Sequence, residues 1–368
     1  MIASVACDRI IEHLSALVGF DSQNPPRDIR ADGAMFQYVH AQLAHDFHIQ
    51  RFDHGNGHVT LLAERGRTDT LFNCHLDTVP VGEGWTDSPF ELVLRNGRAY
   101  GRGSCDIKGA AAVLLALAEA TTVPMALLFT SDEEGAGGCC VDRFLNTDAA
   151  ERYRRVVVCE PTACQAVLSH RGFLSVKGQF HGRAGHSSEA RALQDNAIHR
   201  FGHWLADALT YCQDEADAGR DTCFNAGTVS GGLKSNVIAD QLNVHWSARL
   251  LPGQDNQALL NRLSATTDAE VAEWLVPFSG PPLPIAGRTL DAAREWMTSV
   301  GVDIHERVDF WTEAALFSRG GKDAVVLGPG HIEQAHTVDE WVELDQLERA
   351  ASCYARVLDA NHREAGHD

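Results

Sequence analysis

The feature that most constrains the fold is a set of short apolar segments that alternate with helical patterns in the first half of the chain. Four segments have the length and apolar character of buried strands: 60–64 (TLLAE), 70–74 (TLFNC), 125–130 (MALLFT) and 155–160 (RVVVCE). Apolar residues at helical spacing occur before and between them, over 32–46, 107–120 and 138–146. This alternation predicts an α/β fold with a mostly parallel sheet covered by helices.

The sequence pattern changes after about residue 166. Apolar and polar residues alternate over 166–182, which is typical of an antiparallel strand with one face in water. Two helical patterns and two strand-like runs follow, at 195–212, 255–275, 222–230 and 241–250. The proline-rich stretch 277–284 marks a boundary, and a helix (288–300) and a strand (324–328) then return to the first pattern. We therefore expect a catalytic domain, 1–170 and 281–368, interrupted by a smaller α+β domain over 171–280.

Composition and charge exclude several classes of partner. The 368 residues carry a formal net charge of -19, which repels a nucleic-acid backbone and disfavours an anionic membrane surface. In the first twenty residues, charged side chains lie among apolar residues at helical spacing, unlike the uninterrupted apolar core of a signal peptide. No apolar run approaches the ~18 residues of a membrane span. We expect a cytoplasmic protein that binds neither nucleic acid nor membrane.

Acidic and imidazole side chains follow directly on the ends of the predicted strands. His75 and Asp77 follow the second strand, Glu133 and Glu134 follow the third, and Glu160 ends the fourth. Ligand sites in parallel sheets lie at the carboxyl ends of the strands, so we expect these groups to converge. Each alone has an ordinary interpretation as a capped loop, a solvated turn or a strand end. Together they form a charge cluster that is costly without a cation, so they indicate bound divalent metal.

Six short motifs occur along the chain: HLDTVP (75–80), GRGSCDIKG (101–109), SDEEGAGG (131–138), CEPT (159–162), GRAGHSS (182–188) and QAHT (334–337). In order and spacing they resemble the motifs of the di-zinc amidohydrolase and metallopeptidase family. This family includes acetylornithine and acetylcitrulline deacetylases, succinyl-diaminopimelate desuccinylase, aminoacylase and carboxypeptidase G. The resemblance implies a zinc-peptidase-like catalytic domain with an inserted ferredoxin-like lid and dimerisation domain.

The resemblance also implies a ligand set for two divalent metal ions. Asp106 is expected to bridge the two ions. His75 and Glu160 complete one site, and Glu134 and His336 complete the other. Mixed imidazole and carboxylate ligation suits zinc, with cobalt or manganese as possible replacements. His331 is the alternative to His336, but only the latter stands in the QAHT motif.

Further roles follow from the same resemblance. Glu133 is the expected general base and acid, which takes a proton from water and delivers it to the leaving amine. Asp77 is expected to accept the second N–H of His75 and fix its tautomer. The family's backbone also implies a cis peptide bond between Asp106 and Ile107.

Three residues of the predicted insert match substrate-side positions of the family. His186 is expected to stabilise the reaction oxyanion from across a homodimer; the alternative is a structural loop histidine. Arg249 is expected to hold the substrate carboxylate, the alternative being a surface ion pair. Asn236 resembles a substrate-binding asparagine.

The stretches 308–321 and 328–342 look most similar to the deacetylases of arginine biosynthesis. They imply a small N-acyl amino acid as substrate, N-acetyl-L-ornithine first and N-acetyl-L-citrulline as the alternative. Other hydrolases of the family, a desuccinylase or a dipeptidase, remain open. A metal-binding protein without activity is the non-enzyme alternative.

Overall fold

The computed structural model describes residues 5–26, 29–135, 139–267, 270–305 and 307–365. The chain divides into two compact units. The first comprises Met1–Leu168, Thr289–Arg307 and Thr312–Asp368, and the second comprises Ser169–Arg288 and Val308–Trp311.

The first unit is built on an eight-stranded mixed sheet. Its central strands β6, β3, β7 and β14 run parallel, and the chain adds antiparallel strands β2 and β1 beyond β6. The four strands predicted in the first half of the sequence are confirmed as β2, β3, β6 and β7. In sheet order the strands are β1 (His48–Asp53), β2 (Val59–Arg65), β6 (Met125–Thr130), β3 (Thr70–His75), β7 (Arg155–Val158), β14 (Asp323–Val326), β8 (Ala166–Val167) and β13 (Ile304–His305).

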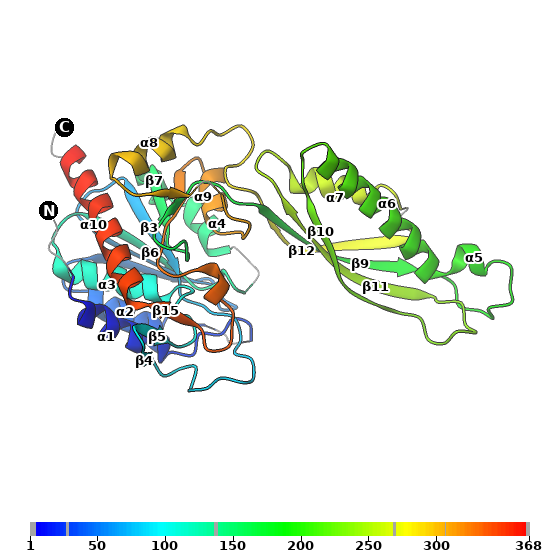
Figure 1. Cartoon of the computed structure of the whole chain (residues 1–368), viewed down its shortest axis with the longest axis horizontal. Coiled ribbons are helices and arrows are strands. Elements are labelled where there is room, and N and C mark those ends of the chain that lie inside the picture. Colours follow the sequence, from blue (N-terminus) through cyan, green and yellow to red (C-terminus); the bar gives the residue numbers. More distant parts are fainter. Residues whose placement is uncertain (1–4, 27–28, 136–138, 268–269, 306, 366–368) are drawn as a thin grey trace. The chain divides into compact units, whose positions relative to one another are not determined.

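Helices cover this sheet on both faces (Figure 1). On one face α3 (Lys108–Ala120) packs against α1 (Cys7–Val18) and α10 (Leu344–Ala365). Helix α3 is almost entirely Ala, Leu and Val, so it can be buried on nearly all sides. On the other face lie α4 (Cys139–Leu145) and α9 (Ala314–Arg319).

Smaller elements complete the first unit. Strands β4, β5 and β15 form a separate three-stranded sheet in which β5 pairs with both others. None of the helices in the described ranges is both long enough and apolar enough to cross a membrane. The remaining elements are α2 (Ala34–Leu43), β4 (Val93–Arg95), β5 (Arg98–Tyr100), η1 (Ala150–Arg152), α8 (Asp291–Ser299), η2 (Ile332–Gln334) and β15 (Trp341–Glu343).

The second unit is a four-stranded antiparallel sheet with helices on one face (Figure 1). Along β11 every second residue is buried, because the alternating sequence turns one face towards the helices. Trp204 and Trp246 are buried in the core between sheet and helices. In sheet order the strands are β10 (Cys223–Gly231), β11 (Gln241–Leu250), β9 (Gly172–His181) and β12 (Ala272–Gly280), and the helices are α5 (Ala192–Asp195), α6 (Ala197–Asp217) and α7 (Asn256–Ser264).

One predicted element of the second unit is wrong in its extent. The helix expected over 255–275 ends at Ser264, and the chain returns as β12. Strand β12 also takes in the first part of the stretch 277–284, which the sequence suggested as a boundary. The segment pairs with β9, and its exposure changes from residue to residue as it does in a strand.

The predicted fold class is confirmed: a mixed, mostly parallel α/β sheet covered by helices, with an inserted α+β unit.

The segment Val308–Trp311 belongs to the second unit. Its Trp311 ring packs edge-on against Phe278, 4.9 Å between centroids, and its indole N–H donates to the Pro281 carbonyl oxygen at 3.0 Å.

Candidate metal centre

The order of the parallel strands brings the acidic loops together. Strand β3 lies between β6 and β7, so its terminal residue His75 has neighbours on both sides. Thr130, at the end of β6, is the register partner of His75 and is followed by the turn that carries Glu133 and Glu134. Glu160 follows the end of β7. The strand ends therefore place all these side chains at one edge of the sheet.

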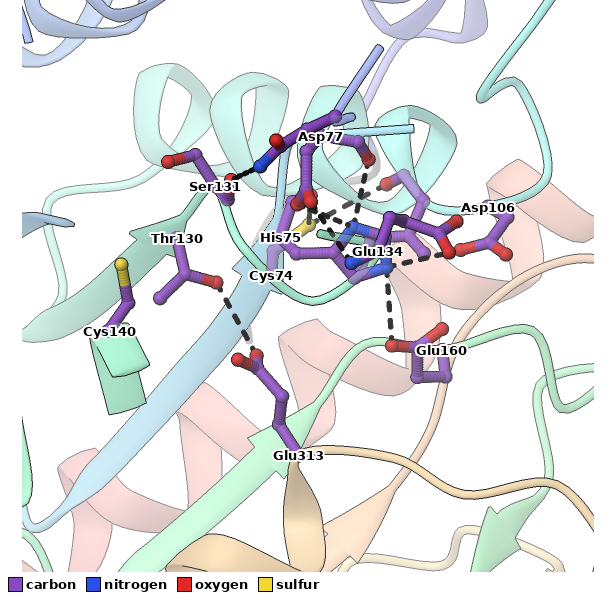
Figure 2. Close-up of polar contacts among 12 residues, drawn as sticks. Cys74, His75, Asp77, Asp106, Thr130, Ser131, Glu134, Cys140, Glu160 and Glu313 are labelled. Carbon is purple, nitrogen blue, oxygen red and sulfur yellow. Dashed lines mark hydrogen bonds and ion pairs between the residues drawn. The ribbon is translucent and has the colours of Figure 1, made fainter. Parts of the chain in front are cut away.

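His75 is the centre of a first group of ligand atoms (Figure 2). Its Nε2 lies 3.2 Å from Asp106 Oδ1 and 3.4 Å from Glu160 Oε1. All three residues are buried. The three ligand atoms lie within 4.8 Å of one another, a spacing that one metal ion can span.

A second group shares Asp106 with the first. His336 Nε2 lies 3.1 Å from Asp106 Oδ2 and 2.9 Å from Glu134 Oε1. The two carboxylate oxygens of Asp106 thus face two different histidines. The peptide bond between Asp106 and Ile107 is cis, which confirms that expectation. His331, the alternative, is in neither group among the described residues.

The first group has the chemistry of a cation site. His75 Nδ1 lies 3.0 Å from the main-chain carbonyl oxygen of Asp77, which can only accept, so Nδ1 carries the proton. In the neutral ring Nε2 then holds a lone pair, and it points at two carboxylates. Within the described part of the chain, Asp106 Oδ1 and Glu160 Oε1 have no hydrogen-bond donor. Three buried atoms that can each offer a lone pair, and that converge on one point, fit a divalent ion.

Without a metal ion, burial and the neighbouring charges shift the pKa values of the ligand side chains. Burial lowers the pKa of His75, but Glu160 and Asp106 outweigh burial and raise it well above its ordinary value. Hydrogen bonds to Asp106 and Glu134 raise the pKa of His336 to about 11. Burial raises the pKa of Glu134 to about 7, against the opposing effect of His336, and burial also raises the pKa of Glu160.

Asp77 contacts both ligand groups. Its carboxylate Oδ1 lies 3.4 Å from His75 Nδ1, so the main-chain oxygen is the nearer acceptor for that ring. Its Oδ2 accepts a hydrogen bond from the Glu134 main-chain N–H at 3.0 Å. Asp77 therefore ties the end of β3 to the turn that carries Glu134.

Glu133 lies in the same turn as Glu134 but belongs to neither ligand group of the described residues. Burial, reinforced by the charge of Glu134, raises its pKa well above the ordinary value. A carboxyl group that holds a proton more strongly than usual, beside a ligand cluster, can serve in proton transfer.

Sequence reasoning missed Glu313, which lies to one side of the cluster and points towards Thr130 (Figure 2). It is fully buried, and its Oε2 accepts hydrogen bonds from Asn73 Nδ2 at 2.8 Å and from Thr130 Oγ1 at 3.4 Å. Burial raises its pKa well above the ordinary value. The signal was a lone acid among apolar residues in WTEAALF, since acids are rarely buried without a partner.

A third cluster with ligand spacing, His58, Asp132 and Cys140, has a simpler explanation. His58 Nδ1 lies 2.7 Å from Asp132 Oδ2, and the main-chain N–H of Cys140 donates to the same oxygen. Burial raises the pKa of the Cys140 thiol, which lies 3.4 Å from the Val59 carbonyl oxygen as a donor. Each of the three residues thus has a hydrogen-bond partner within the fold, so we interpret the cluster as a structural hydrogen-bond network.

The three predicted substrate-side residues belong to the second unit. His186 and Asn236 lie in adjacent segments: His186 pairs with Val237, and the Ser187 N–H donates to the Asn236 carbonyl oxygen at 3.2 Å. His186 is exposed, and its Nδ1 lies 2.7 Å from Ser188 Oγ. Arg249 is on β11, with its guanidinium carbon 3.8 Å from the centre of the Phe173 ring.

Comparison with known proteins decides the family. A family profile described as peptidase family M20/M25/M40 matches residues 71–360. N-acetyl-L-citrulline deacetylase of Xanthomonas campestris pv. campestris is 42% identical over 361 residues, which cover 96% of this chain and 98% of that protein. This chain belongs to peptidase family M20/M25/M40.

Another relative and two solved structures are also similar to this chain. Acetylornithine deacetylase of Myxococcus xanthus is 30% identical over 94% of this chain and 95% of its own length. In fold, an M20 family metallo-carboxypeptidase from Sulfolobus solfataricus matches with a TM-score of 0.75 at 17% identity, covering 97% of this chain and all of that one (100%). A dinuclear metal-binding M20 peptidase from Bacillus subtilis matches with a TM-score of 0.66 at 15% identity, covering 97% and 98% of the two chains. The chain is therefore a metal-dependent amidohydrolase with the M20 fold.

Removing the metal should destabilise the protein, and more so as pH rises. A group whose pKa is raised by folding stabilises the fold below its ordinary pKa, and this contribution is lost as pH rises through the folded value. For Glu134 this stabilisation is lost between pH 4.5 and about pH 7, and for His336 between pH 6.5 and about pH 11. The contribution of His336 to stability is the smaller one, because its ring is half-exposed. We expect the Tm of chelator-treated protein to fall from pH 5 to pH 9.

The control is metal-loaded protein over the same pH range. Bound metal replaces the protons between the ligands, so its Tm should change less, and the gap between the two curves should widen by several degrees. A gap that is constant from pH 5 to pH 9 would contradict this account.

Proposed function

We propose that this chain hydrolyses the amide bond of an N-acetyl-L-amino acid and releases acetate and the free amino acid. The observation that carries the proposal is the carboxylate of Asp106, whose two oxygens join two histidine–carboxylate groups. This arrangement suits a pair of metal ions acting on one carbonyl group.

We place N-acetyl-L-citrulline first among the substrates. The relative that carries this name is 42% identical over 96% of the chain, whereas the acetylornithine deacetylase of Myxococcus xanthus is 30% identical. This reverses the slight preference for N-acetyl-L-ornithine drawn from the sequence, and that compound remains the second candidate. Either activity would suit a step of arginine biosynthesis in the cytoplasm, and we propose this setting.

Zinc is the metal we propose, with cobalt or manganese as replacements. His75, Asp106 and Glu160 would hold one ion, and Asp106, Glu134 and His336 would hold the other. Two imidazoles among carboxylates form a borderline donor set that zinc prefers. When bound, the ions supply Lewis acidity, which polarises the amide carbonyl and makes water easier to deprotonate.

Glu133 is the general base in this proposal. Because neither ligand group includes Glu133, its carboxylate can accept a proton from the attacking water and then donate it to the leaving nitrogen. Asp77 keeps the His75 ring in one tautomer through Nδ1, so that Nε2 presents its lone pair.

Arg249 and Asn236 are the proposed contacts to the substrate. The cation–π contact with Phe173 restrains the Arg249 side chain, and a guanidinium group suits bidentate recognition of the α-carboxylate that all N-acyl amino acids share. The exposed Asn236 lies beside the His186 segment and offers an amide for hydrogen bonding.

We propose a homodimer formed through the second unit. Strand β10 is at an edge of the four-stranded sheet. The outer side of an edge strand presents main-chain N–H and C=O groups that can pair with a second copy. Apolar side chains are exposed on it and beside it, among them Val229, Ile198 and Leu233, the last of which is 89% exposed. In such a dimer His186 of one subunit would stabilise the oxyanion in the other.

Steady-state kinetics on metal-loaded protein test the substrate. The kcat/KM for N-acetyl-L-citrulline and N-acetyl-L-ornithine should exceed those for succinyl-diaminopimelate and a dipeptide by more than tenfold, about 1.4 kcal/mol in transition-state binding. Chelator-treated protein is the control and should be inactive on all four. A tenfold preference for either of the last two compounds would refute the deacetylase assignment but not the metal centre.

Subunit mixing tests the shared site. His186→Ala and Glu134→Gln variants should each be nearly inactive, but their heterodimers should contain one complete site. Random exchange gives half heterodimers, so recovery should approach about a quarter of the original activity for an isologous dimer. Absence of recovery, with subunit exchange proven by mass spectrometry, would count against His186 acting in trans.

A further inference from the structure

A buried carboxylate outside both ligand groups is bound to the loop that carries Asp106. Glu340 is 1% exposed. Its Oε1 accepts from two main-chain N–H groups at 3.0 Å each, and its Oε2 accepts from one main-chain N–H at 3.0 Å and from a guanidinium at 2.7 Å. These donors are Cys105 and Asp106 for Oε1, and Gly103 and Arg102 for Oε2.

The backbone of Glu340 also connects its own segment to the loop that carries Asp106. The Gly101 N–H donates to the Glu340 carbonyl oxygen at 3.0 Å, which continues the ladder between β5 and β15. Gly103 has a φ of +82°, and a Cβ there would lie 2.9 Å from side-chain atoms of Lys108 and Thr78. The loop therefore follows a tight path that buries several of its main-chain N–H groups. The Glu340 carboxylate accepts hydrogen bonds from these groups.

Glu340 also lies close along the chain to the second histidine ligand. His336 precedes it by four residues, and His336 Nε2 is 3.1 Å from Asp106 Oδ2. One side chain thus links the segment of His336 to the main-chain N–H of Asp106 itself. Of the two ligand groups, only the second one (Asp106, Glu134 and His336) includes a residue of the Asp106 loop and also a residue of the His336 segment.

We propose that Glu340 is a positioning residue that sets the distance between Asp106 and His336 and thereby the affinity of the second metal ion. The inference rests on the proposed two-metal function. Glu340 acts through the loop and touches neither the ion nor the substrate.

An ionised carboxylate suits this place because all four partners donate. A glutamine of the same size has one acceptor oxygen and one NH₂ group. In either orientation its NH₂ group faces two donors, so Glu340→Gln loses at least two of the four hydrogen bonds while the shape of the side chain is kept.

Metal titration of the full-length protein tests the proposal. Glu340→Gln should bind one zinc ion about 10–100-fold more weakly than the unsubstituted protein, while the other ion is affected less. Competition with a chromophoric chelator measures both affinities without reference to activity. Hydrogen exchange of the Cys105 and Asp106 amides should also become faster in the variant.

The matched control is Asp339→Asn. Asp339 stands next to Glu340 and ties the same segment to Thr86, accepting from its N–H at 2.8 Å and its hydroxyl at 2.6 Å, but it is outside the metal cluster. This variant should keep both metal affinities. An equal loss in both variants would mean that general tethering of the segment is enough, and would overturn the specific role of Glu340.

Glu340→Asp covers the case in which the glutamine variant does not fold. The aspartate side chain is one methylene shorter, so its carboxylate cannot reach all four donors. The affinity for the second metal ion should therefore fall, but by a smaller factor than in Glu340→Gln. Unchanged affinities in whichever of the two variants folds would overturn the inference. A weakened second site in a protein that hydrolyses no N-acyl amino acid would sink the proposed function and leave the role of Glu340 standing.

Discussion

The carboxylate of Asp106 is the contact on which the site depends. It lies between two histidine Nε2 atoms, 3.2 Å from one and 3.1 Å from the other, and each histidine faces a further glutamate. Buried carboxylates repel one another, and the protonated His75 Nδ1 already faces an acceptor. The arrangement is stable only if positive charge lies among the ligands. The sheet provides the frame, because parallel strands end at one edge and deliver their loops to one place.

Much of this could be predicted from the sequence. Segments such as TLFNC and MALLFT are short and mostly apolar, so they indicate buried strands, and the residues that follow them are expected at the sheet edge. The structure brings His75, Asp106 and Glu160 together, and also Asp106, Glu134 and His336. Asp106 and His336 follow none of the predicted strands that mark this edge, so only the resemblance to a family could suggest them. Their role as metal ligands remains a prediction.

The features that the sequence did not reveal depend on contacts between distant residues. The first four residues of β12 were taken for the end of a helix and most of its remainder for a domain boundary, because nothing local shows that Ala272 pairs with Phe180. Glu340 has the same character: its partners Gly103, Cys105 and Asp106 precede it by more than 230 residues and present main-chain groups, which carry no sequence signal. Burial of an acid becomes visible only when the fold supplies its donors.

The most direct test of the central claim, a two-metal amidohydrolase with a separate base, is the Glu133→Gln variant. Metal analysis and kinetics on N-acetyl-L-citrulline should be done on the same sample. Because Glu133 is in neither ligand group, the variant should keep two metal ions per chain. Loss of the general base should lower kcat by roughly 10²–10⁴-fold. A variant that loses a metal ion, or one that keeps both ions and a near-normal kcat, would contradict the account.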